Sequence, residues 1–145
     1  MPKAYASTVL NAPATEVWAH IRDFNGLPIW NPGVKDSELE DGRAGDQVGA
    51  VRSMHLGDGA HLRERMLSFS DVDRHYSYNF EKTPFSVLNY HAILRVTPVT
   101  DGHRAFVEWW TTFDCEPEKI DDWVHTFAGA VFKGGLDALK ARFGG

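Results

Sequence analysis

Two charged side chains fall on the apolar faces of predicted β-strands, and they are the residues of this sequence best suited to chemistry. Successive side chains of a strand point to opposite faces, so residue parity divides each strand into two faces. Between residues 48 and 56, Arg52 shares the parity of the apolar residues, and between residues 62 and 66 Glu64 does the same. We therefore expect a guanidinium and a carboxylate to point toward the interior.

The turn that joins these two segments predicts that the two charges meet. It is centred on Asp58, with Arg52 six residues before it and Glu64 six residues after it. In a symmetric hairpin such residues lie directly opposite each other, with their Cβ atoms about 5 Å apart. A buried charge is costly alone but tolerated when it is paired and hydrogen-bonded. The sequence thus predicts an acid–base pair inside the sheet.

Two interpretations of this pair remain open at this point. In the first, Arg52 and Glu64 form a structural salt bridge, and the neighbouring tyrosines only fill space. In the second, the pair lies in an apolar cavity with a few convergent polar groups, as in most small-molecule sites. Glu64 would then act as a general acid or base on a bound carbonyl compound, with its pKa raised by burial, and Arg52 would stabilise an oxyanion.

The remaining candidate site residues are mostly aromatic or aliphatic. Parity in the strands, and helical spacing near the C-terminus, place these side chains on the inner wall: Met54, Leu62, Tyr76, Tyr78, Phe80, Tyr90, Phe127 and Val131. Trp30 is expected to be buried beside them. In the segment 105–114 both faces are apolar, so parity does not decide which face is inner. Glu108 and Trp110 from this segment are included as candidates for the wall.

The elements that must position these residues follow from the periodicity of the chain. A first strand over residues 3–10 is followed by two short helices and then by about six strands with tight turns, which is typical of an antiparallel meander. From Lys119 to Phe143 apolar residues recur at spacings of three and four, which predicts a long amphipathic helix. This helix must cover the apolar face of the sheet, so the expected class is α+β, a curved antiparallel sheet gripping a helix.

Composition narrows the classes of function. With 145 residues, the chain is expected to form one domain over residues 1–145. The net charge of −5 argues against nucleic acid as a partner, and no apolar run is long enough for stable membrane insertion. One cysteine, Cys115, fits a reducing cytoplasm. The seven histidines form no ligand motif, so neither a metal site nor a cofactor is expected.

Several segments distributed along the chain together resemble one family. They are NAPATEVWAHIRDF, GAVRSMHLGDGAHLRERML, VLNYHAILRV, VEWWTTFD and FAGAVFKGGLDALK. In order and spacing they resemble the START-related helix-grip superfamily (SRPBCC), in particular its bacterial polyketide cyclase/dehydrase-like branch. The resemblance implies a seven-stranded antiparallel sheet wrapped around a long C-terminal helix, with an internal hydrophobic cavity.

The plant abscisic-acid receptors are similar in the same segments, and the resemblance implies pocket roles for Glu64, Tyr90 and Glu108. Two positions depart from the receptor pattern: Asn31 or a neighbour stands where the receptors have a pocket lysine, and Gly135 replaces an asparagine of the helix. Abscisic acid sensing is therefore not expected.

The lachrymatory-factor synthase is also similar, and it uses an arginine and a glutamate to move protons. Arg52 and Glu64 could supply that pair. The sequence thus favours a protein, monomeric or homodimeric, that binds a small hydrophobic molecule, either aromatic, polyketide-like or lipid. The alternative is a cofactor-independent cyclase, dehydratase or isomerase that uses Glu64 and Arg52.

Overall fold

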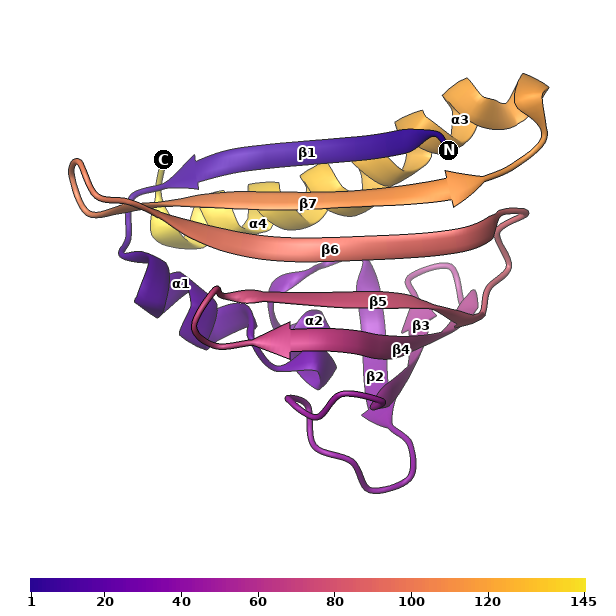
Figure 1. Ribbon diagram of the computed structural model, residues 1–145, viewed down its shortest axis with the longest axis horizontal. Coiled ribbons are helices and arrows are strands. Elements are labelled where there is room, and N and C mark those ends of the chain that lie inside the picture. The colour runs from indigo at the N-terminus through magenta and orange to yellow at the C-terminus, as the bar shows by residue number, and fades with distance from the viewer.

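The computed structural model describes residues 1–145 and contains one curved antiparallel sheet with helices on its concave side (Figure 1). The sheet has seven strands in the order β1-β7-β6-β5-β4-β3-β2. The strands are β1 (Lys3–Leu10), β2 (Val34–Leu39), β3 (Val51–Leu56), β4 (His61–Ser70), β5 (His75–Lys82), β6 (Leu88–Val99) and β7 (Arg104–Asp114). The predicted α+β class and helix-grip architecture are confirmed.

Two short helices connect β1 to β2, as the sequence predicts. They are α1 (Ala14–Ile21) and α2 (Leu27–Trp30), joined by a 3₁₀ turn over Phe24–Gly26. The buried residues of α1 are Ala14, Val17, Trp18 and Ile21, and their spacing of three and four gives this helix one apolar stripe. That stripe packs against β6 and β7, so α1 closes one end of the sheet.

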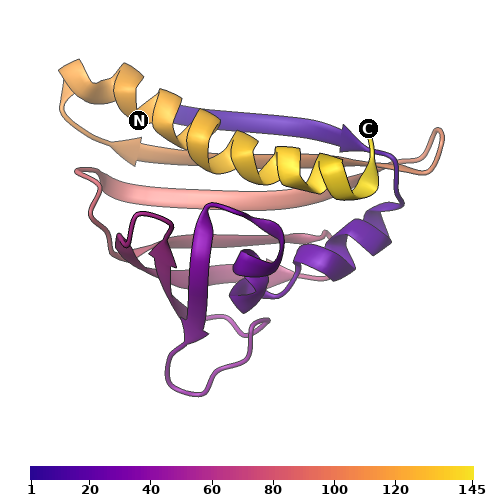
Figure 2. The same ribbon diagram turned by 180° about the vertical axis from the view of Figure 1, so that it is seen from behind.

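The C-terminal helix runs along the sheet from one end to the other (Figure 2). It consists of a 3₁₀ turn (Pro117–Lys119), α3 (Ile120–His125), a π-helical segment (Thr126–Lys133) and α4 (Gly134–Phe143). The predicted extent is therefore confirmed, but the middle of the helix is π-helical rather than α-helical. Phe127 and Phe132, five residues apart, are both buried there, which matches the wider i→i+5 repeat of a π-helix.

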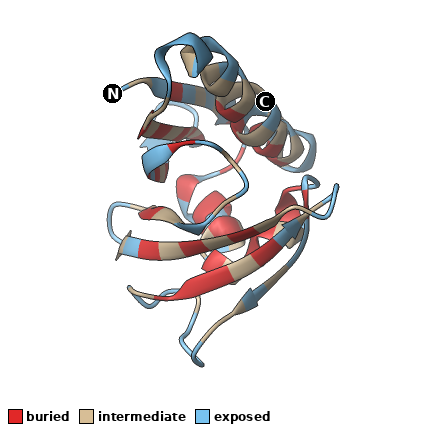
Figure 3. Cartoon of the chain, turned by 90° about the vertical axis from the view of Figure 1, so that its right-hand side faces the viewer, coloured by how far each residue is buried: buried red, intermediate tan, exposed pale blue.

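The core lies between the sheet and these helices, and Figure 3 shows buried residues in red on both the strands and the helices. The strand alternation is regular in β7, in which every second residue from Ala105 to Phe113 is buried. One boundary differs from expectation, because β3 begins at Val51 rather than Val48. Gly49 adopts a φ of +91°, and this left-handed conformation ends the loop just before the strand.

Candidate functional site

The predicted acid–base pair is present and buried. Arg52 of β3 and Glu64 of β4 are direct cross-strand partners, as the symmetric hairpin requires. Arg52 Nε donates a 2.9 Å hydrogen bond to Glu64 Oε1, and Nη2 lies 2.8 Å from the same oxygen without the alignment of a hydrogen bond. The Arg52 side chain has no exposed surface and that of Glu64 is 6% exposed.

Arg52 is fixed from behind by an aromatic residue that the sequence did not indicate. Its guanidinium carbon lies 3.9 Å from the centroid of the Phe24 ring, and Nη1 donates a 2.8 Å hydrogen bond to the Phe24 carbonyl oxygen. Tyr78 and Tyr76 flank it, with ring centroids at 4.8 and 5.8 Å. A guanidinium against aromatic faces is stabilised by cation–π attraction. Arg52 is therefore held as a rigid support for Glu64.

Burial has the largest effect on the pKa of the Glu64 carboxyl group. The low-dielectric surroundings raise the pKa of Glu64 above its usual value, and the opposite charge of Arg52 offsets this only in part. For Arg52, burial alone would lower the pKa, but the Glu64 carboxylate and the two tyrosines outweigh it and the pKa is raised. Arg52 is thus a permanent cation, and Glu64 is the member of the pair that exchanges a proton.

A small apolar cavity lies in front of Glu64, between the sheet and the π-helical segment. Its volume is about 50 Å³, which is room for only a few water molecules and far below the roughly 300–1,000 Å³ of typical ligand pockets. The lining residues are Leu27, Asn31, Val34, Met54, Leu56, Leu62, Glu64, Tyr78, Phe80, Phe85, Tyr90, Trp109, Phe127 and Val131. The gap expected between sheet and helix is therefore real but nearly closed.

Most of the predicted wall residues reach this cavity, and a few lie beside it. Tyr76 packs around Arg52, and Arg52 itself lies behind Glu64 rather than at the cavity surface. Trp30 and Gly135 also lie outside the lining: a Cβ added to Gly135 would be 2.8 Å from the Trp109 ring and 3.2 Å from the Trp30 ring. Gly135 is therefore required here by close packing.

The structure corrects the placement of Glu108 and Trp110. Both lie on the outer face of β7, where Glu108 accepts a 2.7 Å hydrogen bond from the Tyr5 hydroxyl and Trp110 packs against the Tyr5 ring. The inner face belongs to residues of the other parity, including Trp109. Sequence parity could not decide between them because both faces of β7 are apolar.

Trp109 is the main wall residue that the sequence did not indicate. Its Nε1 donates a 3.0 Å hydrogen bond to the Tyr78 hydroxyl, which links β7 to β5 across the cavity wall. Burial raises the pKa of both Tyr78 and Tyr90, so both phenols keep their protons at neutral pH. Leu56, at the end of β3, shares the inner-face parity of Met54 and also lines the cavity. Other lining residues that the sequence did not indicate are Leu27, Val34 and Phe85, which lie at the start of α2, at the start of β2 and in the β5–β6 loop, where no periodicity signals the inner face.

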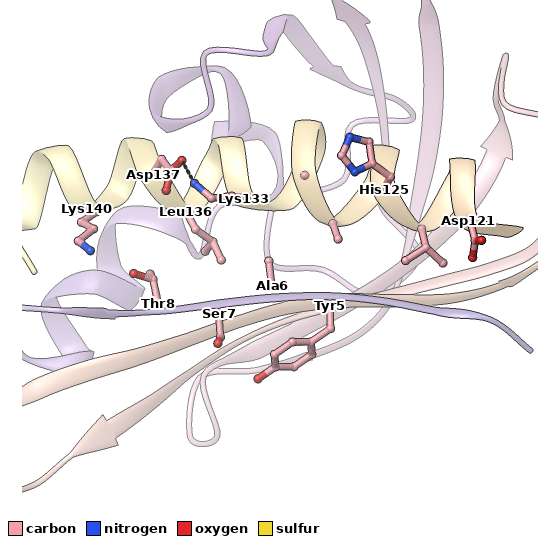
Figure 4. A pocket seen from close by; sticks show the side chains of 13 residues that line it. Tyr5, Ala6, Ser7, Thr8, Asp121, His125, Lys133, Leu136, Asp137 and Lys140 are labelled. Carbon is pink, nitrogen blue, oxygen red and sulfur yellow. Dashed lines mark hydrogen bonds and ion pairs between the residues drawn. The ribbon is translucent and has the colours of Figure 1, made fainter.

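A larger hollow of about 720 Å³ lies on the outside, between β1 and the C-terminal helix (Figure 4). Charged side chains surround it, among them Lys140 and the ion pair that Lys133 forms with Asp137 at 2.7 Å. It is open to solvent and does not contain Arg52 or Glu64. The enclosed cavity is therefore the better candidate site, although the outer hollow has the larger volume.

Two further features limit the chemistry of the chain. No three histidine, cysteine, aspartate or glutamate side chains lie close enough together to hold a metal ion. Each helix of the structure is too short or too polar to cross a lipid bilayer. Acid–base and hydrogen-bonding chemistry at Glu64 is what the site itself offers.

A curved sheet closed by a long helix, with an internal cavity between them, defines the class of helix-grip proteins. The chain belongs to the family described as "Polyketide cyclase / dehydrase and lipid transport", whose sequence profile matches residues 1–144. The XoxI protein of Bacillus cereus is similar in structure, with a TM-score of 0.89 and 31% identity over 99% of this chain and 96% of that one. No curated protein sequence matches.

Two other solved structures extend the comparison. A solution structure from Thermobifida fusca has a TM-score of 0.89 and 32% identity, over 99% of this chain and 94% of its own. Norcoclaurine synthase from Thalictrum flavum, solved with dopamine and hydroxybenzaldehyde, has a TM-score of 0.77 at 16% identity, over 97% of this chain and 84% of its own. This last likeness shows the fold alone.

Proposed function

We propose that the protein binds a small hydrophobic molecule between the sheet and the C-terminal helix. The observation that carries this proposal is an apolar cavity whose wall contains the Glu64 carboxylate, of which Oε2 has no hydrogen bond to the protein. Twelve of the 14 lining residues are hydrophobic, so binding would be driven by removal of apolar surface from water. Aromatic, polyketide-like and lipid molecules all have the required surface.

Ligand entry requires the walls to move, because the closed cavity is too small for such a molecule. Four lining residues are only partly buried: Leu56, Phe80, Phe85 and Val131. They come from the end of β3, the end of β5, the β5–β6 loop and the π-helical segment. We expect these elements to separate when a ligand enters.

Native mass spectrometry against a panel of aromatic and lipid compounds tests the proposal. The wild-type chain should retain one apolar ligand, and Val131→Phe, which fills the cavity from the π-helical segment, should lose it. Ala130→Phe adds the same ring to the exposed side of that segment and should leave retention unchanged. Failure of the wild-type chain to retain any compound would overturn the proposal.

A second candidate function is acid–base catalysis in the same cavity, without a cofactor. The observation that favours it is the buried Glu64 carboxyl, which lines the cavity and whose pKa is raised by burial. Glu64 would take or give a proton on a bound carbonyl compound in a cyclisation, dehydration or isomerisation. Arg52 would position Glu64, since its nitrogens are held by Glu64 and Phe24.

The variant Glu64→Gln separates binding from catalysis once a bound compound is known. It keeps the size of the side chain and removes the titrating group. Turnover should then collapse while binding of an apolar ligand persists. Unchanged turnover would exclude Glu64 from any catalytic step and leave binding as the function.

A further inference from the structure

We infer that this cavity selects neutral ligands that donate a hydrogen bond to Glu64 Oε2, with an alcohol, phenol or amide N–H as the donating group. The inference rests on the proposed function and specifies its ligand class. Three features carry it: the way in which Arg52 fixes the carboxylate, the charge balance of the site and the absence of a hydrogen bond from the wall to Oε2.

The first feature is that the two carboxylate oxygens have different roles. Oε1 takes both contacts from Arg52, at 2.9 Å from Nε and 2.8 Å from Nη2. Arg52 cannot turn to reach Oε2, because Nη1 is bound to the Phe24 carbonyl at 2.8 Å and the guanidinium lies 3.9 Å from the Phe24 ring centroid. Oε2 is therefore left as an acceptor for a group that enters the cavity.

The second feature is that the charges of the site already cancel. Arg52 carries one positive charge and ionised Glu64 one negative charge, and no other lining residue is charged. A cationic ligand would leave an uncompensated positive charge in an apolar enclosure, and a carboxylate ligand would face Oε2 at close range. Both arrangements are costly in a medium of low dielectric constant. A neutral molecule avoids both costs.

The third feature is that no group of the wall donates a hydrogen bond to Oε2. The polar groups of the wall are the Tyr78 and Tyr90 hydroxyls, the Asn31 amide and the Trp109 indole N–H, which donates to Tyr78 at 3.0 Å. The hydrogen bond of Glu64 to the protein is the one from Arg52 to Oε1. A ligand that lacks a donor would bury Oε2 unpaired, and an unpaired buried charge-bearing acceptor is strongly unfavourable. Discrimination between donors and non-donors is thus built into the site.

The same geometry predicts which ligands the Glu64→Gln variant should prefer. Arg52 has only donors, so the amide that replaces the carboxylate must turn its oxygen toward Arg52 and its NH₂ toward the cavity. The group that faces the ligand then changes from an acceptor to a donor. A ligand with an ether or carbonyl acceptor should be preferred over one with a hydroxyl.

Four molecules with one ring test this preference: phenol, anisole, benzoate and benzylammonium. Nuclear magnetic resonance titration of the tryptophan indole N–H signals detects weak binding, and the Trp109 indole lies in the cavity wall. In the wild type, phenol should bind at least about tenfold more tightly than anisole, as expected for a hydrogen bond to a charged group. The two ions should not bind at the site.

In Glu64→Gln the order of phenol and anisole should reverse. Glu38→Gln makes the same chemical change on the exposed face of β2 and should keep the wild-type order. Equal wild-type affinities for phenol and anisole, or binding of either ion, would overturn the inference while leaving apolar binding intact. If neither these rings nor the panel of apolar compounds bound, the proposed function would fail first.

Discussion

At the scale of single residues, the Arg52–Glu64 pair organises the interior of the protein. A buried ion pair is weak support for stability, because the desolvation of two charges offsets much of their attraction. The buried positive charge of Arg52 is nevertheless stabilised on several sides, by Glu64, by the Phe24 carbonyl and by aromatic faces. Removal of one partner would leave the other charge without this compensation.

Replacement of Arg52 by methionine should therefore be strongly destabilising. We expect Arg52→Met to lower the free energy of unfolding by about 3–5 kcal/mol, since it leaves the Glu64 carboxyl buried and unpaired. The double variant Arg52→Met/Glu64→Leu should recover most of this loss. Urea denaturation measures the free energy of unfolding of both variants. A double variant that is less stable than Arg52→Met would contradict this description of the pair.

The protonation of Glu64 should make stability depend on pH in a defined direction. Its pKa in the folded protein is raised above the ordinary 4.5, so the folded state binds the proton more tightly than the unfolded state does. The resulting stabilisation is complete below pH 4.5 and is lost as pH rises through the folded pKa. Urea midpoints of the wild type relative to Glu64→Gln should thus fall as pH rises. An increase over that range would show that the folded pKa is lowered instead.

Residue parity predicted this pair because β3 and β4 form a hairpin without an irregularity between Arg52 and Glu64. The same reasoning failed for Glu108 and Trp110, since the outer face of β7 is also apolar and packs with Tyr5 of β1. It could not find Phe24 at all. That residue lies in a 3₁₀ turn, where neither the strand period nor the helix period applies.

At the scale of elements, two adjacent glycines in α4 face different surroundings. A Cβ on Gly134 would meet no atom within 4 Å, whereas one on Gly135 would be 2.8 Å from Trp109 and 3.1 Å from Asn31. Gly134→Ala should raise the free energy of unfolding by up to about 1 kcal/mol through helix propensity. Gly135→Ala should lower it by about 1–3 kcal/mol through overpacking.

Thermal and urea unfolding of the two alanine variants provide matched measurements on neighbouring positions of one helix. Because both changes add a single methyl group, helix propensity is common to them and packing is the difference. Equal effects of the two substitutions would indicate that α4 does not lie against Trp109 as described.

The turn between β4 and β5 is tied to α1 by Asp71. Its Oδ1 accepts hydrogen bonds from Trp18 Nε1 at 2.8 Å and from Arg22 Nε at 3.0 Å, and Oδ2 accepts one from Arg22 Nη2 at 2.9 Å. Because this site is half exposed, Asp71→Asn should cost only about 1 kcal/mol of stability. Asp73→Asn in the same turn is the control, since no hydrogen bond to the Asp73 carboxylate is present.

The pKa of Asp71 is lowered, first by the Arg22 hydrogen bonds and then by that of Trp18. The contribution of Asp71 to the free energy of unfolding is therefore present above its ordinary pKa of 3.8 and is lost as the pH falls through the pKa of the folded state. The stability difference between wild type and Asp71→Asn, followed by tryptophan fluorescence during urea unfolding, should vanish in acid. A stability difference that persisted at low pH would show that Asp71 acts through packing rather than through its charge.

The elements themselves were largely predictable because their hydrophobic periods are long and regular. The extent of the C-terminal helix, the two short helices and the antiparallel meander all follow from such periods. The π-helical segment does not, since apolar spacings of three, four and five residues coexist between Phe127 and Phe132. How far the helix stands from the sheet depends on side-chain packing, which periodicity does not encode.

At the scale of the whole molecule, the fold encloses a site that is closed in this conformation. The sheet supplies a polar centre, the helix supplies Phe127 and Val131, and the cavity between them holds only about 50 Å³. Binding therefore has to be coupled to a separation of the helix or its neighbouring loops from the sheet. The outer hollow beside β1 is already open and offers the competing location for a ligand (Figure 4).

A crystal structure of the wild-type chain with a compound that it retains in native mass spectrometry tests this account most directly. We predict that the apolar body of the compound lies between the sheet and the π-helical segment, with its hydrogen-bond donor directed at Glu64 Oε2 and the Arg52 contacts unchanged. A compound found instead in the hollow between β1 and the C-terminal helix, with the inner cavity still closed, would contradict it.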